Sequence, residues 1–293
     1  MGANLASPLP GSRPVPIGQL PAVVREASGL AVSRRDPSLR WTHNDRGARP
    51  RLYALDSQGG LRGTVTVTGA GSHDWEDLAT FELEGQAWIL IADTGDNFLR
   101  RHNAVLYLIA EPDPAMLQDD ARISVPLHAR IPVKFPGGPQ DCEGVAVDVV
   151  RREILLVSKR SSPPMIYRLP LVLEPDLARN APAAEALVAL SNLPQPRWWA
   201  MFNVGTGGLL RAWPTGLDIS ADGRTAVVLT YGEPYLFQRA AEEDWAAAFA
   251  RPPRQLSPHG LPQAEAVAFS ADARQILVTT EGAEAPLLRY ELE

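Results

Sequence analysis

Apolar residues along this chain occur in short runs, and the runs are separated by glycine, proline, aspartate and serine. Short apolar runs bounded by turn-forming residues are typical of β-strands. The chain contains 27 prolines and 23 glycines, which suits many turns better than long helices. The pattern therefore predicts an all-β protein.

One phrase of five residues recurs within these runs. Each copy couples a polar residue to a small or acidic one and continues as a short apolar run. The copies lie at residues 28–32, 76–80, 143–147, 215–219 and 265–269, and three of them begin with glutamate. A supersecondary unit repeated at this spacing indicates radial symmetry, as in a β-propeller.

The residues after each copy predict the remaining strands of a blade. The expected strands are 39–45, 51–56 and 63–68 in the first unit, 75–83, 87–93, 104–110 and a segment within 123–133 in the second, 143–149, 153–159, 165–169 and 186–190 in the third, 215–219, 225–231 and 235–239 in the fourth, and 265–269, 274–280 and 287–291 in the fifth. Four short strands joined by tight turns describe a propeller blade. We therefore expect one five-bladed propeller domain at 17–293, with six blades as the alternative.

Several segments fall outside this repeat. Residues 1–16 are rich in proline, glycine and serine and are expected to form a flexible leader. The extended segment 17–24 can supply the strand that the last unit lacks, which would close the ring and remove two open sheet edges. Residues 192–214, with Trp198 and Trp199, are expected to form a long loop, and a sixth blade would need a cryptic unit there. The alanine-rich segment 240–250 predicts a short helix on the rim.

Charge narrows the range of partners. The formal net charge is −6 and the chain lacks a dense cluster of lysine and arginine, so nucleic acid is not an expected partner. A cation or a cationic partner fits better, and the expected partner is a small-molecule substrate. Cys142 is the single cysteine; it excludes an intrachain disulfide, and its acidic neighbours oppose thiolate formation, so it is expected to pack in the core.

Membrane insertion is not expected, because no apolar run approaches the roughly 18 residues of a bilayer span. The N-terminal residues also lack the charged and apolar regions of a signal peptide. The chain is therefore expected to be soluble. It would be periplasmic or secreted if a signal had been removed, and otherwise cytoplasmic; the pattern does not indicate an oligomeric state.

The first residues of the five phrases are candidate ligands of a metal on the propeller axis. In a propeller the first strand of each blade lines the central channel, so Ser28, Glu76, Glu143, Thr215 and Glu265 are expected to meet there. Carboxylates at close range repel unless a cation neutralises them, and oxygen donors suit Ca²⁺. We predict that Glu76, Glu143 and Glu265 bind the ion. The alternative is that they pair with arginines or with backbone amides of turns.

The second strands end at the same face with polar residues, which predicts a second ring around the first. Its members, together with polar residues beside the phrases, are the candidates for substrate and ligand contacts. These additional candidates are Glu26, Asn44, Asp74, Asp96, Asn97, Asp141, Thr215, Tyr231 and Glu281. Asp74 and Asp141 each lie two residues before a channel glutamate, where they can support the ligands or cap turns.

Four residues of the second ring have side chains suited to catalysis: His43, Asp45, Asp93 and Lys159. Imidazole acts as a base near neutral pH, with His73 as the competing histidine. Asp45 and Asp93 can activate water, and Lys159 can stabilise developing negative charge. Lys159 and Arg160 can equally well pair with acidic neighbours.

At the phrases Glu76-Asp-Leu-Ala-Thr, Glu143-Gly-Val-Ala-Val and Glu265-Ala-Val-Ala-Phe, the chain resembles the calcium-containing propeller hydrolases. These include diisopropylfluorophosphatase, paraoxonase, the gluconolactonases and the phytase-like propellers. The resemblance implies that the three glutamates bind a channel calcium. Those relatives usually have six blades; soluble calcium-activated nucleotidases look like a five-bladed analogue.

The resemblance implies a metal-dependent hydrolase of esters, lactones or phosphoesters, of the phosphotriesterase or arylesterase type. Its site would lie on the face where the innermost strands begin. The alternative is a non-catalytic propeller that binds a ligand or a protein and holds a structural calcium.

Overall fold

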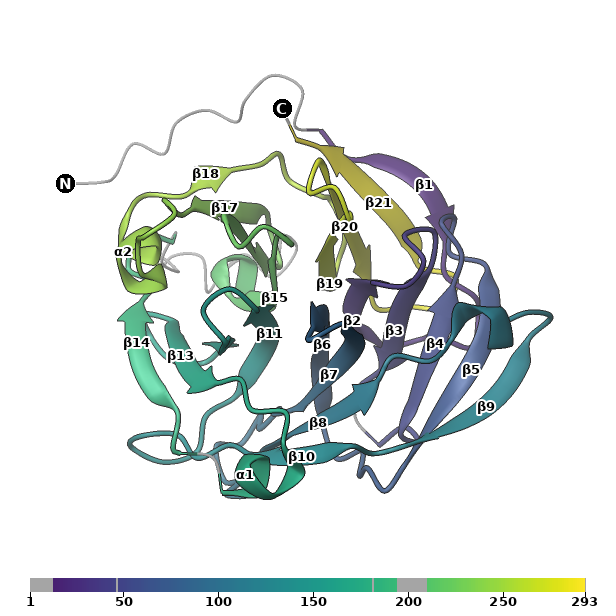
Figure 1. Cartoon of the computed structure of the whole chain (residues 1–293). Helices are drawn as coiled ribbons and strands as arrows, with labels where there is room; N and C mark the ends of the chain where they lie inside the picture. Colours follow the sequence, from purple (N-terminus) through teal and green to yellow (C-terminus); the bar gives the residue numbers. More distant parts are fainter. Residues whose placement is uncertain (1–12, 46, 181, 194–209, 293) are drawn as a thin grey trace.

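The computed structural model describes residues 13–45, 47–180, 182–193 and 210–292. Figure 1 shows five β-sheets arranged as a ring of blades around a central axis. The predicted five-bladed propeller is therefore confirmed. Most of the loop predicted at 192–214, including Trp198 and Trp199, and most of the predicted leader lie outside the described residues.

The strand order within each blade follows the chain from the axis outward. The first blade contains β2 (Ala27–Val32), β3 (Arg40–Asn44), β4 (Arg51–Leu55) and β5 (Leu61–Thr68); the second contains β6 (Trp75–Leu83), β7 (Gln86–Asp93), β8 (Val105–Ala110) and β10 (Ala129–Pro132). The third contains β11 (Cys142–Asp148), β12 (Glu153–Ser158), β13 (Met165–Pro170) and β14 (Glu185–Ala189); the fourth contains β15 (Pro214–Ile219), β16 (Thr225–Thr230), β17 (Pro234–Gln238) and β18 (Arg254–Gln255). The last contains β19 (Ala264–Phe269), β20 (Gln275–Thr280), β21 (Pro286–Glu291) and β1 (Val15–Gln19).

The ring is closed by pairing β1 with β21 in antiparallel register, with Val15 opposite Arg289 and Gln19 opposite Pro286. The N-terminal segment thus supplies the fourth strand of the last blade, as predicted. The strand begins two residues earlier than the expected segment 17–24. This pairing covers the edge of β21, which would otherwise present unpaired backbone groups.

The first blade has one strand that was not expected. A segment within 123–133 was expected to form the outer strand of the second blade, and β10 confirms this. Strand β9 (Ala121–Pro126), which overlaps the start of that range, pairs in parallel with β5 and gives the first blade a fifth strand. Ile123 and Val125 pack against the core beside that blade. The edge of β5 is thereby covered by a segment that leaves and re-enters the second blade.

The hydrophobic cores lie between adjacent blades. Each of the five main clusters of buried side chains joins residues of two neighbouring sheets; Trp41 and Trp75, for example, share the cluster between the first and second blades. The sheets therefore pack face to face around the ring. The predicted rim helix is confirmed as α2 (Trp245–Ala250), which buries Trp245 and Phe249 on the fourth blade.

Other helical segments are short. They are α1 (Pro175–Arg179) and the 3₁₀ segments η1 (Pro114–Met116) and η4 (Leu210–Ala212). Among the described residues, no helix has the length and apolar character required to cross a membrane.

The innermost strands share a β-bulge at one position. The pairing register of β2, β6, β11, β15 and β19 with the second strand of its blade skips one residue in each case. The skipped residues are Ser28, Glu76, Glu143, Thr215 and Glu265, the first residues of the five repeat phrases. A bulge turns a side chain away from the regular alternation of the strand. The equivalence of the five phrases is therefore structural as well as sequential.

Below this level the channel is closed by tight packing and by buried carboxylates. A Cβ added to Gly144 would lie 2.7 Å from the backbone nitrogen of Leu217 in the next blade, so the inner strands approach at a distance that only glycine allows. Asp77 accepts hydrogen bonds from the backbone N–H groups of Leu78 (2.8 Å), Val145 (2.9 Å) and Leu217 (3.3 Å). This one carboxylate connects three blades.

Candidate functional site

The bulges direct three glutamates toward one mouth of the channel, and a lysine lies between two of them. Lys159 Nζ is 2.7 Å from Glu143 Oε2 and 3.6 Å from Glu265 Oε1, and all three side chains are almost completely buried. Burial lowers the pKa of Lys159, but the carboxylates of Glu143 and Glu265 outweigh burial and raise this pKa above its usual value. The ammonium group is therefore a permanent cation within the axial ring.

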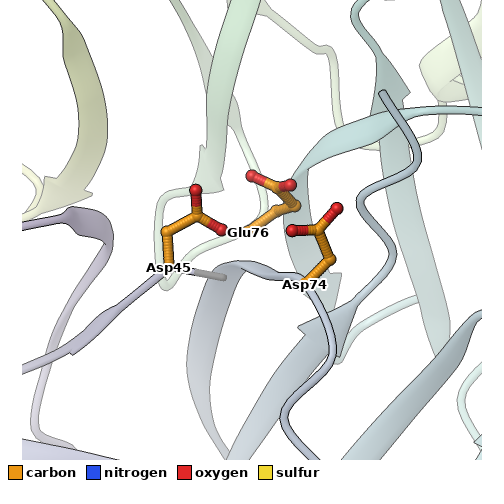
Figure 2. A group of neighbouring side chains, drawn as sticks. All are labelled: Asp45, Asp74 and Glu76. Carbon is orange, nitrogen blue, oxygen red and sulfur yellow. The ribbon is translucent and has the colours of Figure 1, made fainter. Parts of the chain in front are cut away.

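Glu76 also belongs to a group of acids that extends away from Lys159 to the loops of the first two blades. One carboxylate oxygen from each of Asp45, Asp74 and Glu76 lies within 4.8 Å of the other two. Figure 2 shows their three carboxyl groups side by side. Asp45 follows β3 of the first blade, Asp74 directly precedes β6 of the second, and Glu76 is the bulge residue of β6. The group therefore bridges two neighbouring blades.

A second group of acids shares Glu76 with the first. Oxygens of Glu76, Asp141 and Glu143 also lie within 4.8 Å of one another. Burial raises the pKa of Glu76 well above its usual value, and the charges of Glu143, Asp45 and Asp74 add to this effect. Burial likewise raises the pKa of Glu143 to about 8, although Lys159 opposes the shift. Negative charge is concentrated most strongly around Glu76.

Gly95 allows the backbone to approach this group. A Cβ at this position would lie 1.9 Å from Glu76 Oε1 and 2.7 Å from the carboxyl carbon of Asp74. Any other residue would force these carboxylates to move. The glycine lies in the segment that follows β7, where sequence analysis expected a polar strand end but did not single out Gly95.

The acids around Gly95 are braced by arginines. Asp93 accepts a hydrogen bond from Arg101 Nη2 (2.6 Å) and from the backbone N–H groups of His73 (3.2 Å) and Asp74 (3.0 Å). Asp141 accepts a bond from Arg160 Nε at 2.7 Å. Asp93 and Asp141 thus position the loops that carry the acid group, and the hydroxyl of Tyr107 is a fourth, more distant donor to Asp93 at 3.5 Å.

Glu265 faces the lysine side of the mouth and is not part of either acid group of three found in the described chain. It accepts a hydrogen bond from the hydroxyl of Tyr231. Lys159 Nζ lies 5.1 Å from the centre of the Tyr231 ring, which is a cation–π distance. Burial and the neighbouring Glu265 raise the pKa of Glu281 to about 8. Glu143 therefore links the other two predicted ligands, because it belongs to an acid group with Glu76 and shares Lys159 with Glu265.

The remaining candidates of the second ring mostly hold the loops in place. Asn44 Oδ1 accepts the backbone N–H groups of Arg25 (2.9 Å) and Glu26 (3.1 Å). Asp96 Oδ2 accepts the N–H of Arg101 at 2.6 Å, and Asn97 Oδ1 accepts a bond from Arg160. Thr215 Oγ1 donates to the carbonyl of Ala264 and Ser28 Oγ to that of Glu76, each at 2.7 Å. Glu26 is exposed at the rim.

His43 lies beneath the mouth rather than in it. The side chain is fully buried, its Nδ1 is 3.2 Å from the carbonyl of Asn44, and its ring meets Trp75 edge-on. Burial lowers the pKa of His43 to about 4, so the imidazole is neutral at physiological pH. His73, the competing histidine, is exposed.

The buried imidazole should make the fold sensitive to acid. The unfolded chain takes up a proton on His43 near pH 6.5, whereas the folded chain resists protonation down to about pH 4. Stability is therefore lost as pH falls below 6.5, and at pH 5 the loss amounts to about 2 kcal/mol. Urea unfolding of wild type and His43→Gln at pH 8 and pH 5 should show a smaller acid loss in the variant. The exposed His102→Gln should match wild type; an equal acid loss in all three proteins would contradict the expectation.

A pocket adjoins the acid group on the side of the β7–β8 loop. It has a volume of about 390 Å³ and is lined by His73, Asp74, Gly95, Asp96, Asn97, Phe98, Arg100 and Arg101. Asp74 belongs both to the pocket wall and to the acid group. A small molecule in the pocket would therefore lie beside the three carboxylates.

The donor set is compatible with a hard divalent cation. Carboxylate oxygens supply every side-chain donor of the two groups, and Ca²⁺ and Mg²⁺ prefer oxygen ligands. The backbone of Gly95 packs directly against the carboxyl groups of Glu76 and Asp74. The residues therefore fit an ion of the calcium type.

The sequence predicted that most of these acidic residues lie near the mouth of the channel, but it did not predict which of them lie together. Asp45 was predicted as a catalytic residue and Asp74 as a support, and the structure brings both to Glu76. Gly95, Arg101 and Asp77 were missed. The run Thr94-Gly95-Asp96-Asn97 at the end of a strand was the available signal for the first of these.

Comparison with known proteins gives only distant likenesses. No protein-family model and no curated protein matches the sequence. A gluconolactonase from Xanthomonas campestris has a TM-score of 0.49 and 11% identity, over 100% of this chain and 93% of that one. The PQQ-bound aldose sugar dehydrogenase of Streptomyces coelicolor has a TM-score of 0.46 and 11% identity, over 97% and 100% of the two chains.

A chain of the nidogen–laminin complex is similarly remote, with a TM-score of 0.45 and 14% identity over 92% of this chain and 81% of that one. These three structures are of a lactonase, a dehydrogenase and a complex of two proteins. Likeness at this level carries no argument about activity, so function has to be argued from the residues at the mouth of the channel.

Proposed function

We propose that the protein binds a divalent cation of the calcium type through Asp45, Asp74 and Glu76, and that it hydrolyses esters, lactones or phosphoesters at this mouth of the channel. The observation that supports the proposal is the close approach of these three carboxylates, within 4.8 Å, from two blades. Asp74 and Glu76 are buried there, beside a pocket of small-molecule size.

A cation relieves the electrostatic cost of this arrangement. Glu76 is only 3% exposed, and burial together with its acidic neighbours raises its pKa well above the usual value. Like charges held this close in a buried site repel strongly unless they are neutralised. Lys159 pairs with Glu143 and Glu265 and partly offsets the rise in the pKa of Glu76. A divalent ion would add positive charge beside Glu76, where the charges of Asp45 and Asp74 raise that pKa further.

Different residues at the mouth would bind the cation, accept a proton and hold the loop in position. When bound, a divalent cation supplies positive charge that polarises a carbonyl or phosphoryl oxygen. Asp74 and Glu76 are the buried members of the group and would hold the ion. Asp45 is only half-buried, so one of its carboxylate oxygens can accept a proton from an attacking water. Arg101 and Asp93 would keep the loop of Gly95 in position.

The proposal predicts that Glu76→Gln weakens cation binding. The amide keeps the shape of the side chain but cannot ionise, so it removes the carboxylate that a bound cation would stabilise. We expect the dissociation constant for Ca²⁺, measured by isothermal titration calorimetry, to rise by at least about 100-fold, because loss of a group that merely supports a ligand already costs about 10–100-fold. Metal-dependent hydrolysis across an ester, lactone and phosphoester panel should be lost with it.

A matched control lies on the same strand. Glu82→Gln removes an exposed glutamate of β6 and should leave both binding and turnover at wild-type levels. Wild-type Ca²⁺ affinity in Glu76→Gln would refute the site. Binding that depends on Glu76, with no turnover on the whole panel, would support the ligand-binding propeller instead of the hydrolase.

A further inference from the structure

The loop between β7 and β8 projects an apolar tip beside the acid group. Phe98 is 74% exposed and Leu99 is 45% exposed, and both belong to the few large apolar side chains that reach the surface in the described ranges. Leu99 has a φ of 52°, in the left-handed region that leucine rarely adopts. Phe98 also lines the pocket beside the acid group, so an apolar group of a ligand in that pocket would contact its ring.

The base of this loop is fastened by Arg101. Its backbone N–H donates to Asp96 Oδ2 (2.6 Å), its Nη1 to the carbonyl of Gly95 (2.8 Å) and its Nη2 to Asp93 Oδ1 (2.6 Å). The backbone N–H of Asp96 in turn donates to Asp141 Oδ1 at 2.7 Å. The base of the loop is therefore fixed on both sides of the tip, which limits the entropy cost of binding a ligand against the loop.

The two arginines of the loop, Arg100 and Arg101, differ in burial and in ion pairing. Arg101 is largely buried and pairs with Asp93. Arg100 is exposed, lines the pocket and makes no ion pair with any residue that the structure describes. A planar guanidinium is well suited to bind phosphate oxygens in a bidentate manner. Arg100 thus offers a cation on the same pocket wall as the ring of Phe98.

We propose that this loop selects phosphoesters that carry an aromatic or other apolar group, with Arg100 binding the phosphoryl oxygens and Phe98 contacting the apolar group. This inference rests on the proposed function, which it narrows from three ester classes to one. The phosphoryl group would lie between Arg100 and the acid group around Asp74, where the bound cation offsets repulsion from the carboxylates. A neutral ester or lactone would make no use of Arg100.

Binding can be tested without turnover. Phenylphosphonate carries the anion and the aromatic ring but is not a substrate for hydrolysis, and methylphosphonate carries the anion alone. In calorimetry with Ca²⁺ present, we expect Arg100→Gln to weaken phenylphosphonate binding about tenfold and Arg100→Lys to restore part of the affinity. Phe98→Ala should weaken phenylphosphonate binding about five- to tenfold and leave methylphosphonate binding unchanged.

Arg35→Gln is the matched control, because Arg35 is exposed in the turn that follows β2 at the opposite end of the inner strands. It should bind phenylphosphonate as wild type does. In kinetics with p-nitrophenyl phosphate, Arg100→Gln should raise KM and leave kcat close to wild type, while hydrolysis of p-nitrophenyl acetate should not respond.

The outcomes separate this inference from the proposed function. Loss of phenylphosphonate affinity in both loop variants, with no turnover of any aryl phosphate, would support the loop as a binding site and refute the hydrolase. Hydrolysis that depends on Glu76, with wild-type affinity and KM in Arg100→Gln and Phe98→Ala, would overturn the role of the loop. Failure of the wild-type protein to bind phenylphosphonate would overturn it as well.

Discussion

Replacement of Lys159 by methionine should destabilise the metal-free protein by about 3–5 kcal/mol, the range found when one partner of a buried ion pair is removed. Methionine preserves most of the volume of the lysine stem but leaves Glu143 and Glu265 without the cation that lies 2.7 and 3.6 Å from their oxygens. The carboxylates then have to take up protons or remain as buried, uncompensated charges. Urea unfolding in the presence of a chelator measures the loss.

A double variant tests whether the loss of stability comes from the unpaired charge. A Lys159→Met, Glu143→Gln double variant removes both partners of the shorter contact, so it should recover a substantial part of the lost free energy of unfolding. Ca²⁺ should also protect Lys159→Met more than it protects wild type, because the freed carboxylates offer additional oxygen ligands. An unfolding midpoint equal to wild type in chelator would show that the lysine contributes nothing to the ring.

Replacement of Asp77 by alanine should cost about 3–9 kcal/mol, since each of three buried N–H groups left without an acceptor costs about 1–3 kcal/mol. The carboxylate of Asp77 accepts three backbone N–H groups, from Leu78, Val145 and Leu217. Two of these donors belong to other blades. Loss of the carboxylate therefore removes contacts across the channel as well as within β6. Thermal and urea unfolding of the variant provide the measurement.

Asp218 offers a matched comparison on another inner strand. It accepts the backbone N–H groups of Ile219 (2.7 Å) and Phe269 (2.8 Å), only one of which lies in another blade. Asp218→Ala should thus cost less than Asp77→Ala. Equal losses in the two variants would show that the number of blades joined is irrelevant, and a loss below about 1 kcal/mol in Asp77→Ala would mean that water replaces the carboxylate.

The propeller could be predicted from the sequence because the β-bulge of each innermost strand coincides with a recurring pattern of residues. The polar first residue of each phrase marks the extra residue of the innermost strand, and the apolar residues after it mark the strand itself. Strand β9 could not be assigned in the same way. Its alternation of buried and exposed residues is satisfied equally by the first or the second blade, and its parallel pairing with β5 depends on the path of the intervening loop.

The sequence predicts which residues lie near the mouth of the channel, but it does not predict which of their side chains contact one another. The phrases place Glu76, Glu143 and Glu265 at equivalent positions, yet the insertion of Lys159 between two of them depends on the direction of a long side chain. The grouping of Glu76 with Asp45 and Asp74 depends on loops of two blades. Spacing along one chain does not contain these distances.

The pairing of β1 with β21 has a consequence for how the protein is made. Blades whose strands follow one another in sequence can form as they leave the ribosome, because their contacts are local. The last blade is different, because Val15 cannot pair with Arg289 until the C-terminal strand has been synthesised. Until synthesis reaches that point, the nascent chain is an open arc with an unpaired edge, and pairing across so large a separation is slow. Chaperone contact during synthesis would therefore be concentrated on this seam.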